Sequence, residues 1–374
     1  MRSVVYVDIS QFYSHPARSG IQRVIGNLFL SLKDEPFTII YVFDLEQTLY
    51  QIDHDTFINA FNEYWISGDQ SALQFKLLDH ALLLLPHDIV HGIYFLPEVT
   101  YLANQEIIRD RFQSKCVSLA MVFDLFPMTH PQFFQGNGMI GPSQYFRALA
   151  NFDRHVCISE YTRKSLSKVH QRLPRNPEVI TLETDFGRYR VFNSTNRQEN
   201  HNFIVVGTLE PRKHHLKIFD VFEKINAKGD SNITLSFIGK EGWLPSWQLE
   251  HFHEKVKEHY WFEINSGASD LEIADFMSRA TGLISVGFEG FGLPIIEARS
   301  LGCPVIFGGE QPAGNLLKGE YCLEIPSPMH DRFESELSLA IINLCELKTK
   351  TFVDSSLETF SKNIISFLNQ VALE

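Results

Sequence analysis

The segment from residue 285 to residue 306 reads SVGFEGFGLPIIEARSLGCPVI and holds two glutamates on either side of a glycine-rich turn. Glu289 precedes the Gly-Phe-Gly-Leu-Pro run of residues 290–294, and Glu297 follows it. Backbone N–H groups at a helix N-terminus favour anionic or hydroxyl-rich ligands, and carboxylates beside them accept hydrogen bonds from sugar hydroxyls. If the turn leads into a helix, the segment therefore predicts a site for a ligand of this kind.

The residue types in the turn also predict that helix. Gly290 and Gly292 allow the backbone to approach a ligand closely, because neither carries a Cβ atom. Pro294 suits the first turn of a helix, in which its missing N–H breaks no hydrogen bond. Gly302 predicts the end of the helix. We therefore expect a loop that leads into a helix, with Glu297 in the first helical turn.

A pair of cations follows the apolar run of residues 203–206, in the sequence Gly207-Thr-Leu-Glu-Pro-Arg-Lys. The run predicts a parallel strand, and ligands of α/β sheets bind at the carboxyl ends of the strands. Arg212 offers a planar fork of donors and Lys213 a point charge, so together they suit a diphosphate. The alternative is a pair of solvated cations in a surface loop.

The first half of the chain holds four further candidates. Gly20 and Arg23 lie at the start of a helical pattern, and the alternative role of Arg23 is a surface salt bridge. Asp124 directly follows an apolar run, and His130 lies shortly after it in the sequence PMTHP. A lone histidine is usually structural, so the residue types alone do not assign a role to His130.

Strand-like runs alternate with helical patterns along the whole chain, which is typical of α/β folds with parallel sheets. Apolar residues recur at helical spacing over residues 21–32. The predicted strands cover residues 4–9, 38–43, 88–95, 117–123, 155–158, 179–182, 203–206, 233–238, 261–264, 282–286 and 305–307.

The length of 374 residues exceeds the size at which single hydrophobic cores stop growing, so we expect two domains. Residues 193–202, NSTNRQENHN, are polar and lack periodicity, which predicts a linker. The linker separates an N-terminal domain of residues 1–192 from a C-terminal domain of residues 203–351. Residues 352–374 end the chain, with a helical pattern from residue 357 onward.

Composition excludes several classes of protein. The net charge of −12 gives no electrostatic footprint for nucleic acid. The five cysteines are scattered and show no metal-ligand spacing, which favours reduced core cysteines in a cytoplasmic protein. The longest apolar run, residues 81–86, is shorter than the ~20 residues of a membrane span. No leader is apparent, and we expect no metal and at most a peripheral membrane contact of the N-terminal domain.

Two motifs resemble one enzyme family. The two glutamates with GFGLP between them resemble the signature of the retaining GT-B glycosyltransferases of family 4, and GTLEPRKHH at residues 207–215 resembles their phosphate loop. The resemblance implies two Rossmann-like, doubly wound parallel-sheet domains that face each other across a cleft. It also implies that the C-terminal helix crosses back to the N-terminal domain, which binds the acceptor, while the C-terminal domain binds the donor.

The resemblance also implies roles for individual residues. Arg212 and Lys213 contact the donor pyrophosphate and stabilise the leaving nucleoside diphosphate. Glu297 binds the ribose hydroxyls and Glu289 faces the donor sugar. Ser285 is similar to the family's serine at the end of the strand before the motif, although a strand-end cap explains it equally well. The remaining donor-binding positions that the resemblance implies are Gly20, Gly207, Gly290, Phe291, Gly292 and Leu293.

Two N-terminal stretches extend the resemblance to a branch of bacterial polysaccharide enzymes. GIQRV from Gly20 is similar to the family's first glycine loop, with Arg23 in the first turn of a helix. VFDLFPMTHP is similar to a stretch that reads HDLxPxxHP, but Phe123 replaces the usual histidine. Asp124 and His130 remain acceptor-side candidates, together with Arg23.

The resemblance implies transfer of a hexose, with mannose or rhamnose favoured and GDP-mannose the first expected donor. The acceptor would be a surface polysaccharide or a lipid-linked oligosaccharide, and no cofactor is expected. A catalytically inactive nucleotide-sugar-binding module remains open, as does another GT-B activity such as an epimerase or a phosphorylase. A glycosidase pair is disfavoured, because nothing places the two glutamates across one bond. An NAD-dependent oxidoreductase is excluded, because no GxGxxG follows the first strand.

Overall fold

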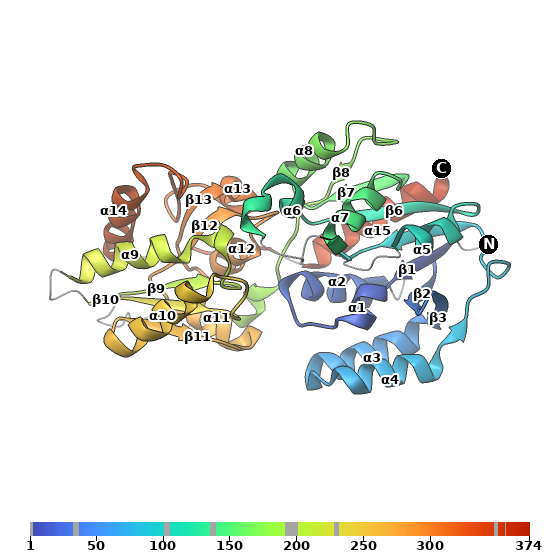
Figure 1. The fold of residues 1–374 in the computed structure, drawn as a ribbon, viewed down its shortest axis with the longest axis horizontal. Coiled ribbons are helices and arrows are strands. Elements are labelled where there is room, and N and C mark those ends of the chain that lie inside the picture. The colour runs from blue at the N-terminus through green and yellow to red at the C-terminus, as the bar shows by residue number, and fades with distance from the viewer. Residues whose placement is uncertain are drawn as a thin grey trace. The chain divides into compact units, whose positions relative to one another are not determined.

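The computed structural model describes residues 3–32, 37–100, 105–134, 140–190, 201–227, 232–347, 351–355 and 357–374. The chain divides into two compact units. Unit 1 comprises Met1–Leu182 together with Leu357–Glu374, and unit 2 comprises Glu183–Ser356. Each unit is built around its own sheet, and helices flank both sheets (Figure 1).

The sheet of unit 1 has eight strands among the described residues, in the order β4-β3-β2-β1-β5-β6-β7-β8. The strands β1, β2, β5, β6, β7 and β8 are parallel, as predicted, whereas β3 and β4 are antiparallel. Their bounds are β1 Val4–Asp8, β2 Thr38–Leu45, β3 Thr48–Asp53, β4 Leu82–Leu83, β5 Gly92–Leu96, β6 Cys116–Val122, β7 Arg154–Cys157 and β8 Glu178–Val179.

The hairpin between β2 and β3 was not predicted. Its turn is formed by Glu46 and Gln47, which both have positive φ, at 52° and 64°. Turns of this kind usually contain Gly, Asn or Asp, so the sequence LEQT gave no turn signal. The expectation of purely parallel sheets is therefore wrong at this edge of unit 1.

Four helices of unit 1 start at well-formed caps. Ser19, Asp53, Asp69 and Ser159 each accept a hydrogen bond from a backbone N–H in the first turn of the helix that follows. The helices are α1 Ser10–Ser14, α2 Gly20–Ser31, α3 His54–Ser67, α4 Gln70–His80, α5 Gln105–Phe112, α6 Phe126–Thr129, α7 Ile140–Leu149, α8 Glu160–Val169 and the C-terminal α15 Leu357–Leu373, with a 3-10 turn η2 at Pro131–Phe133.

The C-terminal helix α15 packs on α2 and β5 of unit 1, although unit 2 precedes it in the sequence (Figure 1). Its apolar face buries Phe360, Ile364 and Leu368. This is the crossing back of the last helix that the resemblance implied. Residues 351–355 belong to unit 2, where the N–H of Val353 donates to the Arg299 carbonyl at 3.1 Å.

Unit 2 holds a six-stranded, fully parallel sheet among its described residues, in the order β11-β10-β9-β12-β13-β14. Its strands are β9 His201–Val206, β10 Ile233–Ile238, β11 Phe262–Asn265, β12 Gly282–Phe288, β13 Val305–Glu310 and β14 Cys322–Ile325. Its helices are α9 His215–Asn226, α10 Ser246–Glu258, α11 Asp270–Arg279, α12 Leu293–Ser300, α13 Pro312–Leu317 and α14 Phe333–Glu346, with 3-10 turns η4 at Phe186–Tyr189 and η5 at Pro211–Lys213.

Aromatic side chains fill the core of unit 2. Phe219 stacks on Trp261 at 5.4 Å between ring centroids and meets Phe262 edge to face at 4.9 Å. Phe237 and Phe252 extend this cluster toward α10. The five cysteines, all of them within the described residues, form no disulfide bond with one another. The close packing of these aromatic side chains holds the sheet rigid behind the loops at the carboxyl ends of its strands.

The linker prediction lies largely outside the described residues. Of residues 193–202, the structure describes only the last two, and these are already part of β9. The division between the units lies after Leu182, earlier in the chain than the predicted domain end at residue 192.

Candidate functional site

Gly207 directly follows β9 and allows the Lys213 side chain to fold back over the end of the strand. Gly207 has φ of 126°, a conformation that L-residues rarely adopt. A Cβ atom at this position would lie 2.8 Å from Nζ of Lys213. The loop then turns through η5, which carries the predicted cation pair.

Gly287, in β12, brings the second motif against the first. Gly287 has φ of 97°, and a Cβ atom there would lie 1.9 Å from the carbonyl oxygen of Arg212. Only a glycine allows this approach of η5 to β12. The backbone of Glu289 is fixed just beyond, where its N–H donates to the Glu310 carbonyl at 2.8 Å. Two motifs that are far apart in the sequence therefore meet at one edge of the sheet.

Arg212 and Lys213 both form ion pairs with Glu289. A guanidinium nitrogen of Arg212 lies 2.9 Å from Oε2 of Glu289, and Nζ of Lys213 contacts Oε1 of the same carboxylate. The second terminal nitrogen of Arg212 lies 2.5 Å from Oε1 of Glu210. The Arg212 side chain also donates to the Phe288 carbonyl. We call these four residues, Glu210, Arg212, Lys213 and Glu289, the ion cluster.

The ion cluster is shielded from water, and its charges are strongly coupled. The side chains are between 2% and 15% exposed. Burial alone would raise the pKa of Glu289, but Arg212 and Lys213 outweigh it and lower the pKa to about 2. Burial raises the pKa of Glu210, and Arg212 offsets this in part. At neutral pH Glu289 is therefore a carboxylate and does not serve as a proton donor.

Glu210 was not predicted as a site residue. It stands in the quoted motif, but only the structure shows that its side chain is buried against Arg212. Its second oxygen, Oε2, is buried and has no hydrogen-bond partner in the described part of the chain. Glu210 therefore supplies a second, buried carboxyl partner for Arg212 in the loop after β9.

The loop after Glu289 leads into α12, as predicted. Gly292 has φ of 100° and is the N-cap residue, whereas Gly290 does not have a positive φ. Pro294 lies in the first turn, and Gly302, with φ of 77°, follows the end of the helix. The prediction that Glu297 lies in the first turn is wrong, because α12 begins at Leu293 and the first turn ends before Glu297.

The other donor-side candidates lie near this loop. Glu297 is buried within α12, and Phe291 is buried in the loop, where its carbonyl accepts from the Ala313 N–H at 2.8 Å. Ser285 lies inside β12 rather than at its end, because the strand continues to Phe288. Its hydroxyl donates to Oε1 of Gln311 at 3.3 Å.

Gly20, a donor-binding candidate, and the three acceptor-side candidates lie in unit 1. Gly20 is the first residue of α2, and Arg23 is buried in the first turn. Asp124 follows β6, and its Oδ1 accepts from the Phe126 N–H at 3.2 Å. His130 follows α6, where its Nδ1 lies 2.9 Å from the Thr129 hydroxyl.

Unit 1 also contains a pocket of about 240 Å³ at the carboxyl ends of its strands. Asp124 lines this pocket, whereas His130 and Arg23 do not. Glu98 and Gln22 line it as well, and neither was predicted. Glu98 follows β5 closely, so a carboxylate just beyond an apolar strand, the signal that identified Asp124, could have found it.

Metal donors do not cluster in the described ranges. Among these residues no group of three or more His, Cys, Asp or Glu side chains could hold a metal ion. The cations Arg212 and Lys213, which both pair with Glu289, are of the types that bind diphosphates. A bound diphosphate would compete with Glu289 for both side chains.

Known proteins match this chain in sequence and in fold. Residues 190–319 match the family described as Glycosyl transferases group 1. Two Escherichia coli proteins named serotype-specific mannosyltransferase WbdA are 27% and 38% identical over 326 residues, and each match covers 80% of this chain. The chain spans only 38% of the length of each of these relatives.

A solved structure extends the similarity to the whole fold. Anabaena Alr3699/HepE, in complex with UDP and glucose, aligns with a TM-score of 0.63 at 14% identity, over 100% of this chain and 96% of its own. At this identity the likeness concerns the fold alone, and the structural relatives are GT-B glycosyltransferases. The chain thus carries a glycosyl transferases group 1 domain at residues 190–319 within a GT-B fold.

Proposed function

We propose that this chain is a retaining glycosyltransferase that moves a hexose from a nucleotide-diphosphate sugar to a growing surface polysaccharide or a lipid-linked oligosaccharide. The observation that carries the proposal is the ion cluster of unit 2. Two largely buried cations stand just beyond the carboxyl end of β9, and both form ion pairs with the carboxylate of Glu289. The match of residues 190–319 to a glycosyltransferase family supports the same reaction class.

In the proposed reaction the donor diphosphate takes the place of Glu289 beside Arg212 and Lys213. The bond between the sugar C1 and the diphosphate oxygen breaks, and both cations stabilise the charge that develops on the leaving group. The acceptor hydroxyl oxygen bonds to C1 on the same face, and its proton passes to the leaving phosphate.

Once displaced from the cations, Glu289 is free to accept hydrogen bonds from hydroxyls of the donor sugar. Glu297 would bind the ribose, and the N–H groups of Phe291, Gly292 and Leu293 would hold a hydroxyl or a phosphate oxygen. The backbone arrangement at the start of α12 supports this assignment, because the first N–H groups of a helix have no partners within it. No metal or other cofactor takes part in the proposal.

Mannose from GDP-mannose is the first proposed donor group. The curated relatives are named mannosyltransferases, and a further Escherichia coli relative is named O-antigen chain mannosyltransferase B. These names describe proteins of which the chain spans a minor part, so the sugar and the acceptor belong to the proposal.

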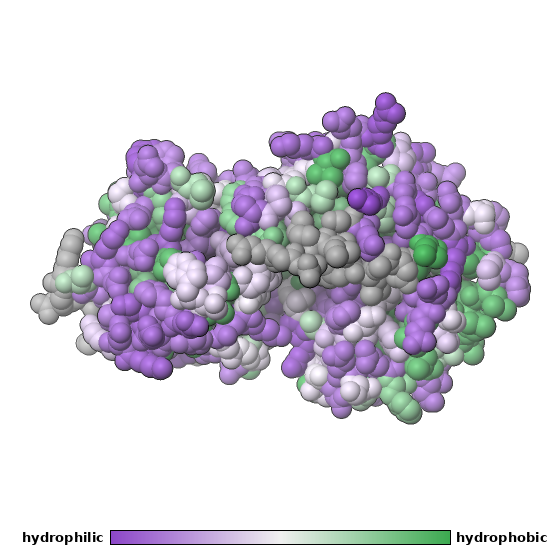
Figure 2. Space-filling model, viewed as in Figure 1, coloured by the Kyte–Doolittle hydropathy of each residue, from purple (hydrophilic) through white to green (hydrophobic). Residues whose placement is uncertain are grey.

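A peripheral contact of unit 1 with the cytoplasmic face of the membrane is also proposed. No helix in the described residues has both the length and the apolar character to cross a membrane. Figure 2 shows hydrophobic side chains gathered around α4, where Ile66, Phe75, Leu82 and Leu83 are exposed. On α8 two further cations, Lys164 and Lys168, are exposed and could meet an anionic surface.

Release of nucleoside diphosphate from a panel of GDP-, UDP-, dTDP- and ADP-sugars, with and without a membrane lipid extract, tests the proposal. We expect release from one sugar nucleotide, stimulated by the extract, and loss of release in Arg212→Ala. Lys224→Ala is the matched control, because it removes an exposed cation of unit 2 that pairs with Glu334. Tight nucleotide binding without release from any donor would instead support the inactive binding module.

A further inference from the structure

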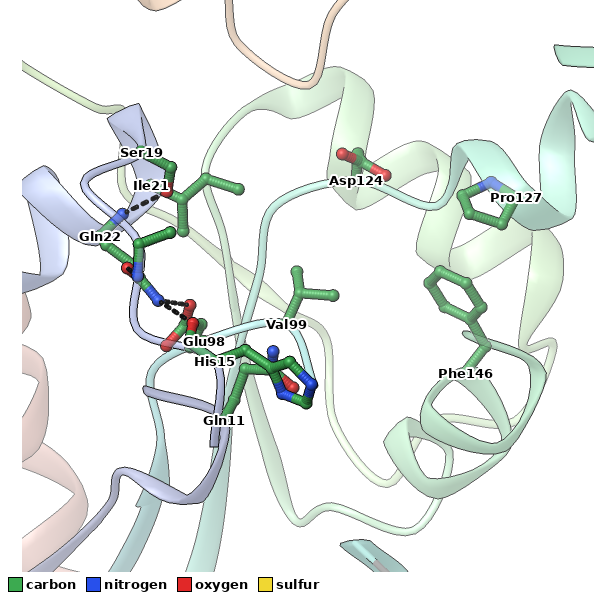
Figure 3. A pocket seen from close by; sticks show the side chains of 11 residues that line it. Gln11, His15, Ser19, Ile21, Gln22, Glu98, Val99, Asp124, Pro127 and Phe146 are labelled. Atoms are coloured by element: carbon green, nitrogen blue, oxygen red, sulfur yellow. Dashed lines mark hydrogen bonds between the residues drawn. The ribbon is translucent and has the colours of Figure 1, made fainter. Parts of the chain in front are cut away.

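The pocket of unit 1 joins polar and apolar walls (Figure 3). Gln22 and Glu98 lie on one side, and Asp124, Pro127 and Phe146 lie across from them. Pyranose rings offer hydroxyls at the edge and C–H groups on the faces, so a mixed wall of this kind suits a sugar. The volume of about 240 Å³ is below the ~300–1,000 Å³ of pockets for drug-sized ligands, which favours one sugar ring over a chain.

Glu98 is held in the pocket wall by Gln22. The Gln22 amide nitrogen donates to Oε1 of Glu98 at 2.8 Å and to the His15 carbonyl at 3.4 Å. The Gln22 amide oxygen accepts from the Ala17 N–H at 2.6 Å. The amide nitrogen and the amide oxygen of Gln22 are both engaged, and the side chain ties Glu98 to the loop that precedes α2.

The second carboxylate oxygen of Glu98 is the available group. Within the described part of the chain, the Gln22 contact is the one hydrogen bond that the Glu98 side chain makes, and Glu98 is 9% exposed. Its free oxygen is not among the fully enclosed atoms that lack a partner. An oriented carboxylate oxygen at a pocket wall accepts a hydrogen bond from a sugar hydroxyl, and burial strengthens such a bond.

Burial also sets the charge of Glu98. It raises the pKa to about 7, against the lowering effect of the Gln22 hydrogen bond, and the nearby carboxyl of Asp8 raises it further. Asp8 is itself buried at the end of β1 and bonded to Tyr94. The other titratable groups of the pocket are His15, between α1 and α2, and Asp124, after β6.

We propose that this pocket binds the terminal, uncharged hexose residue of the acceptor, and that Glu98 determines its specificity by accepting hydrogen bonds from the hydroxyls of that residue. The inference rests on the proposed function, because it assumes a glycan acceptor. The pocket should also exclude acidic sugars. A sugar carboxylate would lie beside the carboxylates of Glu98 and Asp124, and like charges repel.

Steady-state kinetics of the full chain with methyl α-D-mannoside as acceptor test the inference. Glu98→Gln should raise the acceptor KM about tenfold or more and change the donor KM less than twofold. The wild-type acceptor affinity should also vary with pH near 7, and the variant should lose this dependence. Glu63→Gln is the matched control, an exposed glutamate of unit 1 whose carboxylate is 68% exposed.

A second variant keeps the inference testable if Glu98→Gln folds poorly. Val99→Phe leaves Glu98 in place and narrows the pocket, so it too should raise the acceptor KM. An unchanged acceptor KM in either well-folded variant would overturn the inference, as would equal changes in the acceptor and donor KM.

Direct binding separates a failure of this inference from a failure of the proposed function. Absence of nucleoside diphosphate release from every donor would refute the transferase, whatever the pocket binds. Saturation-transfer NMR with methyl α-D-mannoside and methyl β-D-glucuronide then tests the pocket alone. We expect binding of the mannoside only, lost in Glu98→Gln. Equal binding of both sugars, or of the mannoside by the variant, would overturn the inference.

Discussion

Replacement of Glu289 by Gln should destabilise unit 2 and at the same time make its stability depend on a bound nucleotide. In the free protein Glu289 neutralises Lys213 and part of the charge of Arg212, two cations that are 11% and 15% exposed. Removal of one member of a buried ion pair leaves the other charge without compensation. The loss of stability affects the protein without a bound nucleotide, because a bound diphosphate would supply the missing negative charge.

The pKa of Glu289 gives the size of the effect. Its fall from 4.5 to about 2 corresponds, at 1.36 kcal/mol per unit, to roughly 3 kcal/mol. A lowered carboxyl pKa contributes stability that is present above pH 4.5 and is lost as the pH falls through about 2. The full amount is therefore present at pH 7. For a unit of this size, it corresponds to a melting temperature lower by roughly 6–12 °C.

Thermal unfolding followed by tryptophan fluorescence measures the effect, because Trp243, Trp247 and Trp261 of unit 2 dominate the signal over Trp65 of unit 1. We expect GDP to raise the melting temperature of Glu289→Gln by more than it raises that of the wild type. Turnover should fall about 10- to 100-fold with no loss of GDP affinity, from one lost charge-assisted bond to the sugar.

Two results would refute the reasoning. A melting temperature equal to that of the wild type at pH 7 would show that the ion cluster does not stabilise unit 2. A smaller stabilisation by GDP in the variant than in the wild type would show that the diphosphate does not replace Glu289. Glu324→Gln, which removes an exposed pair with Lys318 in the same unit, controls for the loss of a surface charge.

Three further predictions concern single positions. Arg212→Ala should weaken both GDP binding and turnover by about 10- to 100-fold, as measured by calorimetry and steady-state kinetics, and a change below twofold would contradict its role at the diphosphate. Gly207→Ala should destabilise unit 2 by roughly 1–3 kcal/mol in denaturant unfolding, because residue 207 has a positive φ and the new Cβ atom would lie against Lys213. A variant as stable as the wild type would rule out this strain. Glu98→Gln should gain stability relative to the wild type as the pH rises. The pKa of Glu98 is about 7 in the folded protein and 4.5 in the unfolded chain, so its contribution to stability is full below pH 4.5 and is lost as the pH rises through 7. The loss amounts to at most roughly 3 kcal/mol. Equal stability differences at pH 5 and pH 8 would contradict that shift.

Apolar runs between polar turns predicted most strands of both sheets, since a parallel strand is buried on both faces and shows a continuous apolar run. Such a pattern does not report the direction of pairing. The antiparallel β3 was missed for a second reason as well. Its turn at Glu46 and Gln47 contains no residue that usually adopts positive φ. Helices α3 and α4 were also missed in this region, where the sequence analysis assigned no elements.

The candidate site was predicted in part. The motifs identified Arg212, Lys213 and Glu289, and the structure brings the three side chains together. The position of Glu297 was wrong because helix starts are uncertain by a residue or two, which is enough to move a side chain out of the first turn. The sequence does not report which side chains are buried against each other, so it did not show that Glu210 forms an ion pair with Arg212.

The pocket of unit 1 illustrates a different limit. Gln22 and Glu98 are 76 positions apart in the sequence, and their hydrogen bond exists only because β5 lies beside β1 in the sheet. No local spacing encodes such a pair. Its role in binding the acceptor stays a prediction that rests on the geometry of the pocket.

The anomeric configuration of the transferred sugar tests the central claim most directly. Proton NMR of the product from GDP-α-D-mannose and methyl α-D-mannoside reports it through the new anomeric signal. The account predicts one new α-linked mannose for each GDP released by the wild type, and none with Lys213→Met. A β-linked product, or release of free mannose with no disaccharide, would contradict it.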